Sequence, residues 1–175
     1  LILGIISGLG GAFFLKSLQK AESASGLFAW PIWVKLGLAG LAVGLMALVF
    51  PGVWGNGYEI TNQILKAESP ETLSSGLIKG SLLAELEAWQ IPLVVLAGLF
   101  VAKFAATVVA VGSGTIGGVF TPTLFLGAGL GAAFGQALDL LGFAEGTPTA
   151  AFALVGMGSI LAATTRSPLL AMILI

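Results

Sequence analysis

The feature that most limits how this chain can fold is a tract of 35 residues without a charged side chain, Phe104–Leu138. Residues 1–15, Leu36–Tyr58 and Gly146–Thr165 are also free of charge, and a further apolar run begins at Ser167. A helix of about 20 apolar residues crosses a hydrocarbon core about 30 Å thick. Together these tracts predict about five complete or partial membrane spans.

Composition restricts the function as well as the fold. The chain is 57% hydrophobic and 9% charged, whereas soluble domains carry about 25% charged residues. Its net charge of −1 leaves no basic patch for nucleic acid. Cys and His are absent from the sequence, which excludes disulfides, thiolate catalysis and Ser–His chemistry from this chain. We therefore predict an all-α, multi-pass integral membrane protein that is not an enzyme and uses no metal or cofactor.

Aromatic and polar residues indicate where the spans end. Trp30, Trp33, Trp54 and Trp89 lie beside the predicted spans, where interfacial aromatic belts occur. The segment 66–90 holds six of the 15 charges and is predicted to be a polar or interfacial connection. Neither end of the chain has a cap or turn signal. We therefore expect residues 1–175 to be a partial transmembrane domain of a longer protein.

Many of the 26 glycines recur at a helical spacing of four residues. These are Gly4 and Gly8, Gly40 and Gly44, and Gly127, Gly131 and Gly135. Small residues at this spacing let transmembrane helices approach one another closely. We interpret them as sites of helix–helix packing.

Three other glycines spell a different pattern. Gly112, Gly114 and Gly117 form G-x-G-x-x-G after a β-branched run, which is typical of a dinucleotide-binding turn. That turn requires a second strand that ends in an acidic residue about 20 residues later, and Asp139 lies at about that distance. However, Pro122 and further glycines interrupt the segment, and no second strand is indicated. The context thus argues against a dinucleotide-binding turn. A soluble nucleotide-binding enzyme is the alternative to a membrane protein.

The same segment also fits a helix that begins inside the membrane. Proline favours the first helical position, here Pro122, and Thr121 before it is predicted to be the cap. Gly117 and Gly118 carry no side chain that would crowd a ligand. A helix N-terminus presents unpaired N–H groups and about half a positive charge. At 4 Å and a dielectric constant near 20, this attracts a monovalent anion by about 2 kcal/mol. We predict a small anion here; the alternative is a helix start that packs without an ion.

The segment "GSGTIGGVFTPTLFLGAGLGAAFG" resembles the third signature of the CLC chloride channels and chloride/proton antiporters. Its motif G-x-F-x-P is complete at Gly118–Pro122. Two more segments are similar to the same half of that family: "GMGSILAATTRSPLLAMILI", from Gly156, and "GNGYE", at 55–59. The resemblance implies a multi-span bundle with broken helices, one half of an inverted-repeat architecture.

The resemblance also implies a site and an assembly. In this family the amides of the x and F residues ligate the central chloride, which carries over to the backbone N–H groups of Val119 and Phe120. Gly117 and Gly118 would allow the ion to approach. The family protein is a homodimer with one pore per subunit, and we expect the protein in the cell membrane. The chain would form most of the second repeat, with its helices from Ser167 near the dimer contact.

The resemblance does not extend to every functional residue of the family. "GSGTI" at 112–116 imitates the family's first anion motif, but it lies in the third segment, so Ser113 does not inherit that serine's role. The gating glutamate, the inner proton-transfer glutamate and the inner tyrosine lie outside this range, so the sequence does not distinguish a channel from an exchanger. An inverted-repeat transporter of small anions from a different family and a non-conducting assembly partner also fit the sequence.

Overall fold

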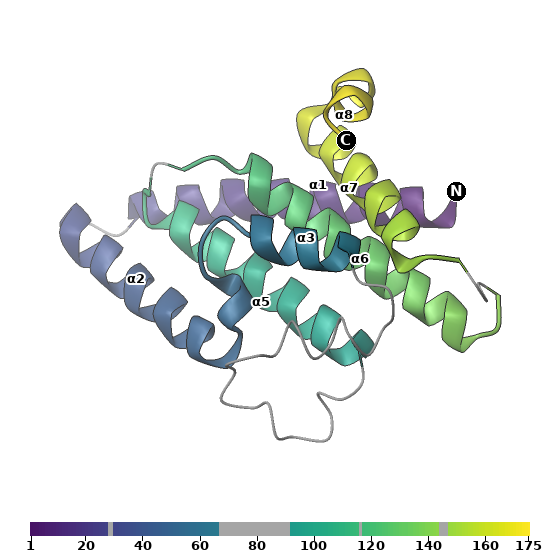
Figure 1. Ribbon diagram of the computed structural model, residues 1–175. Helices are drawn as coiled ribbons and strands as arrows, with labels where there is room; N and C mark the ends of the chain where they lie inside the picture. Colours follow the sequence, from purple (N-terminus) through teal and green to yellow (C-terminus); the bar gives the residue numbers. More distant parts are fainter. Residues whose placement is uncertain (28–29, 67–91, 116, 144–146) are drawn as a thin grey trace.

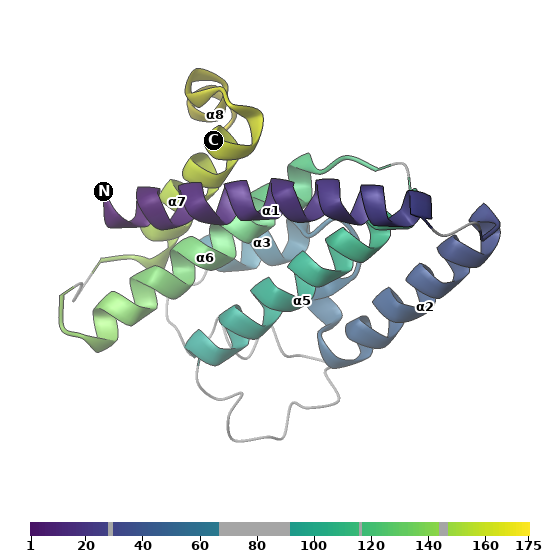
Figure 2. The ribbon, with the colours of Figure 1, turned by 180° about the vertical axis from the view of Figure 1, so that it is seen from behind.

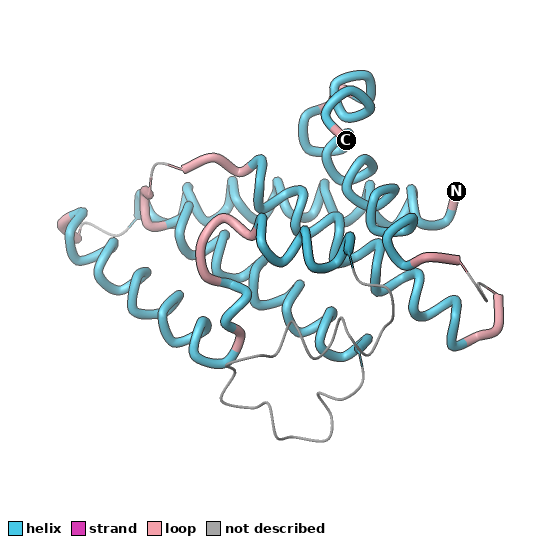
Figure 3. The backbone as a smooth tube through the Cα atoms, viewed as in Figure 1, coloured by secondary structure: helices cyan, strands magenta, loops and turns pink. Residues whose placement is uncertain are grey.

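The structure is a computed structural model that describes residues 1–27, 30–66, 92–115, 117–143 and 147–175. Within these ranges every regular element is helical (Figure 3). Four of the described helices are long and apolar enough to cross a membrane. The all-α membrane fold is therefore confirmed. The predicted polar connection at 66–90, including Trp89, falls almost entirely outside the described residues.

The first half of the fold contains two long helices and a short one. Helix α1 (Ile2–Leu27) is followed by α2 (Ile32–Val49), a 3-10 turn (Pro51–Val53) and α3 (Tyr58–Lys66). The predicted span Leu36–Tyr58 is thus shorter than expected. Proline has no N–H for an intrahelical bond and disfavours a helical residue before it, which explains why α2 ends before Pro51.

The second half contributes most of the core. It consists of α5 (Pro92–Gly112), α6 (Phe120–Leu140), α7 (Thr149–Thr165) and α8 (Pro168–Leu174). Helix α6 lies between α5 and α7 in Figure 1, and α1 crosses behind them, as the reverse view in Figure 2 shows. More of α6 is buried than of any other described membrane-span candidate. The bounds of α5 and α6 show that the long uncharged tract Phe104–Leu138 is divided between these two helices.

The glycines of α6 lie against α7, as the spacing predicted. A methyl group at Gly127 would lie 2.5 Å from the Met157 Cα, and one at Gly135 would lie 2.6 Å from the Phe152 ring. At Gly131 the added carbon would fall on the Phe152 carbonyl oxygen. Glycine here lets the two backbones touch.

The other two glycine pairs have no such neighbour among the described residues, so for them the packing stays a prediction. A Cβ added at any of them would meet no described atom within 4 Å. These positions are Gly4, Gly8, Gly40 and Gly44. Spacing identifies one face of a helix, but it does not say whether another helix covers that face. Gly40 and Gly44 instead line a cavity between α2 and α5.

The end of α7 shows how the sequence turns the chain into α8. Arg166 adopts the left-handed conformation (φ 55°) and ends α7. Ser167 then caps α8, its side-chain oxygen accepting a bond from the Leu170 N–H at 3.4 Å, and Pro168 occupies the first turn. A proline is well tolerated there because the first helical N–H groups have no partner inside the helix.

Candidate anion site

The turn between α5 and α6 is built from Ser113 and Gly114. The Ser113 hydroxyl donates to the Ala110 carbonyl oxygen at 2.6 Å and lies 3.0 Å from the Thr115 hydroxyl. Gly114 has a φ of +89°, a conformation that favours glycine. The hydroxyl of Ser113 therefore helps to end α5, a structural role that fits the expectation that Ser113 is not an anion ligand.

The α6 helix begins two residues earlier than the sequence suggested. Val119 is the N-cap, without a side-chain capping bond, and Phe120 is the first helical residue. Thr121 and Pro122 therefore lie within the first turn, so their predicted positions as cap and first residue are wrong. The physical reason is that none of the first-turn amides needs an intrahelical partner, so proline fits at several positions there.

The first amides of α6 have no acceptor within the helix. The first hydrogen bond of the helix is donated by the Thr123 N–H to the carbonyl oxygen of the cap residue Val119, at 3.0 Å. The N–H groups of Val119 and Phe120 precede it and are left without an intrahelical partner. The side chains of both residues are partly exposed, at 37% each. Backbone donors and the positive end of a helix dipole thus coincide at one point on the surface of the chain.

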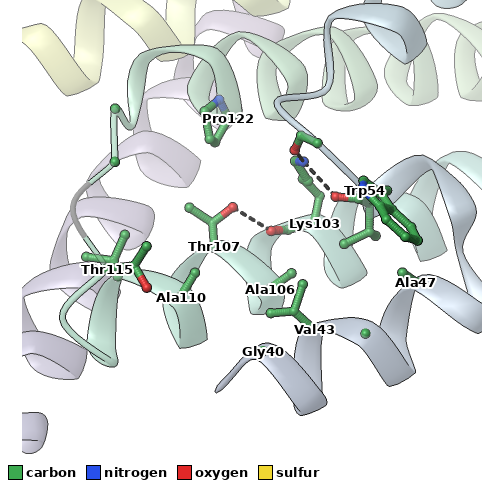
Figure 4. A pocket seen from close by; sticks show the side chains of 16 residues that line it. Gly40, Val43, Ala47, Trp54, Lys103, Ala106, Thr107, Ala110, Thr115 and Pro122 are labelled. Carbon is green, nitrogen blue, oxygen red and sulfur yellow. Dashed lines mark hydrogen bonds between the residues drawn. The ribbon is translucent and has the colours of Figure 1, made fainter. Parts of the chain in front are cut away.

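A cavity of about 510 Å³ lies beside the helix start. Gly117, Gly118 and Pro122 form part of its wall, together with residues of α2, α5 and the turn after α2 (Figure 4). A methyl group added at Gly117 or Gly118 would meet no atom of the residues that the structure describes within 4 Å. Both glycines therefore border open space. Val119 and Phe120 are not among the residues that line this cavity, although they directly follow the glycines that do.

The sequence did not point to one residue of this cavity, Lys103. Its side chain is 3% exposed, and its ammonium donates to the carbonyl oxygens of Val53 at 2.9 Å and Gly55 at 2.8 Å. A signal was present, because Lys103 is the only charged residue of α5. Lys103 immediately precedes the uncharged tract Phe104–Leu138. In the sequence it therefore indicated only where that tract begins. Among the described residues, no cluster of three or more His, Cys, Asp or Glu could hold a metal ion.

Comparisons with known proteins identify the family and several relatives of this chain. The sequence pattern of the voltage gated chloride channel family matches residues 1–175. A ClcB-like chloride channel protein of Ralstonia nicotianae is 36% identical over 173 residues, which cover 99% of this chain and 35% of that relative. A voltage-gated ClC-type chloride channel, ClcB, of Escherichia coli is also 36% identical, over 98% of this chain and 36% of the relative.

The chain thus spans about a third of the length of the curated relatives that it matches. No solved structure matches it. The family match extends over every described helix and includes the G-x-F-x-P helix start of α6. This chain therefore belongs to the voltage gated chloride channel family.

Proposed function

We propose that this chain forms part of a chloride pathway, in which the ion binds to the backbone N–H groups of Val119 and Phe120. The start of α6 carries this proposal, because its first amides have no partner inside the helix and the glycines before it border a cavity. A helix N-terminus attracts anions without a formal charge. Chloride is the ion named for the relatives of this chain.

Backbone amides suit a site through which an ion must pass. A conducting site has to replace part of the hydration shell, yet it must release the ion again. A helix start achieves this with about half a charge, whereas a cationic side chain in contact with the ion would hold it more strongly. Gly117 and Gly118 leave room for the ion beside the amides.

The proposal extends to assembly and location. We place the protein in the cell membrane as a homodimer, with α8 near the contact between subunits. Helix α8 buries Ala171 alone within the described chain and leaves Leu169, Met172 and Ile173 more than 70% exposed. Cysteine crosslinking at Met172 in native membranes tests this placement, since a monomeric band under oxidising conditions would contradict it.

The mode of transport is tested with the full-length protein in chloride-loaded liposomes. Anion efflux and external pH are recorded together. Efflux with coupled proton uptake identifies an exchanger, and efflux without proton movement identifies a channel. Folded and inserted protein that moves no chloride in either mode would contradict the proposed function.

The site itself is tested by deleting one amide. Val119 has a φ of −86°, close to the value that proline imposes, so Val119→Pro removes the N–H with little change of conformation. A hydrogen bond to a charged group contributes about 1.5–3 kcal/mol, which corresponds to a loss of roughly 10- to 150-fold in chloride affinity. Isothermal titration with chloride measures this loss.

Val119→Ala is the matched control, because it shortens the side chain and keeps the amide. We expect its chloride affinity to stay within about twofold of wild type. Equal losses in the two variants would indicate that the side chain matters rather than the N–H group. An unchanged affinity in Val119→Pro would remove this amide from the site.

A further inference from the structure

The single charged side chain of α5 points into the cavity beside the start of α6. Lys103 lies in the middle of this membrane-spanning helix and is 3% exposed. A charge at such a depth is costly, and where it occurs it usually marks an ion pathway or a paired partner. The surroundings of Lys103 decide between these two explanations.

In the described part of the chain, the contacts that Lys103 makes are with neutral groups. Its ammonium donates to the carbonyl oxygens of Val53 and Gly55, at 2.9 Å and 2.8 Å. The ring of Phe125 lies 5.5 Å from the same nitrogen, within the range of a cation–π interaction. Carbonyl dipoles and a ring face solvate a positive charge but do not cancel it. Lys103 therefore adds net positive potential to the cavity wall.

The position of Lys103 connects it with the proposed anion site. It shares the cavity wall with Gly118 and Pro122, which precede and follow the α6 amides in the chain (Figure 4). Its ring contact, Phe125, belongs to α6 itself, little more than one turn after the helix start. One side chain thus links α5, the turn that follows α2, and α6.

We propose that Lys103 is a positioning residue of the anion pathway, whose charge raises the affinity of the cavity for the anion at the α6 start. This inference rests on the proposed function. The two carbonyl oxygens hold the ammonium at the turn, so it acts through space and not as a direct ligand. A cation in contact with the ion would slow its release. A cation fixed on the wall attracts the ion and also orders the Val53–Gly55 turn.

The test replaces Lys103 in the full-length protein and measures chloride affinity by isothermal titration. Lys103→Met keeps the length of the side chain but removes the charge. We expect it to lower chloride affinity roughly tenfold, equivalent to about 1.4 kcal/mol. Lys103→Arg keeps the charge and should bind chloride within about threefold of wild type.

Lys35→Met is the matched control. The Lys35 ammonium also donates to a backbone carbonyl, that of Ser25 at 2.7 Å, but Lys35 is not part of this cavity. We expect its chloride affinity to equal that of wild type. A loss comparable to that of Lys103→Met would show that any lysine charge has the effect, and would overturn the inference.

Folding is followed separately by the midpoint of thermal unfolding. If Lys103→Met does not fold, Lys103→Gln carries the same expectation, because it keeps a donor for the turn carbonyls. Wild-type affinity in a folded neutral variant overturns the inference, as does an equal loss in Lys103→Arg. If no neutral variant folds while Lys103→Arg behaves as wild type, the role of Lys103 is structural and the inference is also overturned.

These outcomes remain separate from those for the amide site. If wild-type protein binds no chloride, the proposed function fails. If Val119→Pro binds chloride as tightly as wild type, the Val119 amide is removed from the site. If Val119→Pro loses affinity while Lys103→Met does not, the amide site stands and only the role of Lys103 is refuted.

Discussion

Replacing Gly131 by Ala is expected to force α6 and α7 apart. The added carbon would fall on the Phe152 carbonyl oxygen and would lie 2.8 Å from the Phe152 carbonyl carbon and 2.9 Å from the Ala153 Cα. These are backbone atoms, so no side chain can rotate to make room. Overpacking of this kind costs about 1–3 kcal/mol.

Gly129→Ala provides an internal control on the same helix. Gly129 is also buried, but the nearest atom to a Cβ there would be the Phe100 Cδ2, at 4.0 Å. Both substitutions gain the same helix propensity, about 1 kcal/mol relative to glycine. The difference between the two variants therefore isolates the steric clash. We expect Gly131→Ala to be less stable than Gly129→Ala by about 1–3 kcal/mol.

Reversible unfolding of the full-length protein in detergent micelles measures this difference. Chloride is kept constant, since a bound ligand would stabilise both variants. Equal free energies of unfolding would refute the reasoning, because they would mean that Gly131 does not limit the distance between α6 and α7. A more stable Gly131→Ala would refute it more strongly.

Two further expectations concern the site and its surroundings. Gly118→Ala should leave the unfolding midpoint unchanged, because its methyl group meets no atom within 4 Å in the described chain. It should lower chloride affinity in titration, since the methyl narrows the approach to the amides, and wild-type affinity would place the ion elsewhere. Asp139→Asn should leave chloride efflux from liposomes unchanged. Asp139 is exposed near the end of α6, far along the helix from Phe120. A large loss of efflux would give this carboxylate a role in transport.

Much of the fold could be predicted from the residues along α6. The absence of charge in Phe104–Leu138 indicated the membrane, and Gly127, Gly131 and Gly135 indicated a close helix contact. Both predictions rest on residues that are near one another in the sequence, so they do not depend on which helix packs against α6. The break within the tract was also visible, because Gly114 and Pro122 oppose a continuous helix.

The rest depends on contacts between distant parts of the chain. The same spacing that packs Gly131 against α7 leaves Gly40 facing a cavity, and the sequence does not specify which face is covered. The start of α6 differed by two residues because proline is tolerated throughout a first turn. The setting of Lys103 depends on Val53 and Gly55, about 50 residues earlier in the chain, which no local pattern reveals.

The buried lysine has a consequence for biosynthesis. The translocon selects a segment by the sum of its residue preferences, in which a central Lys costs about 2.5–3.5 kcal/mol and each Leu, Val or Phe contributes about 0.3–0.6 kcal/mol in favour. Helix α5 contains 11 Leu, Val and Phe residues, so their sum of about 3–7 kcal/mol offsets the lysine. The segment can therefore enter the bilayer by itself, before the carbonyls of Val53 and Gly55 are in place to receive the ammonium.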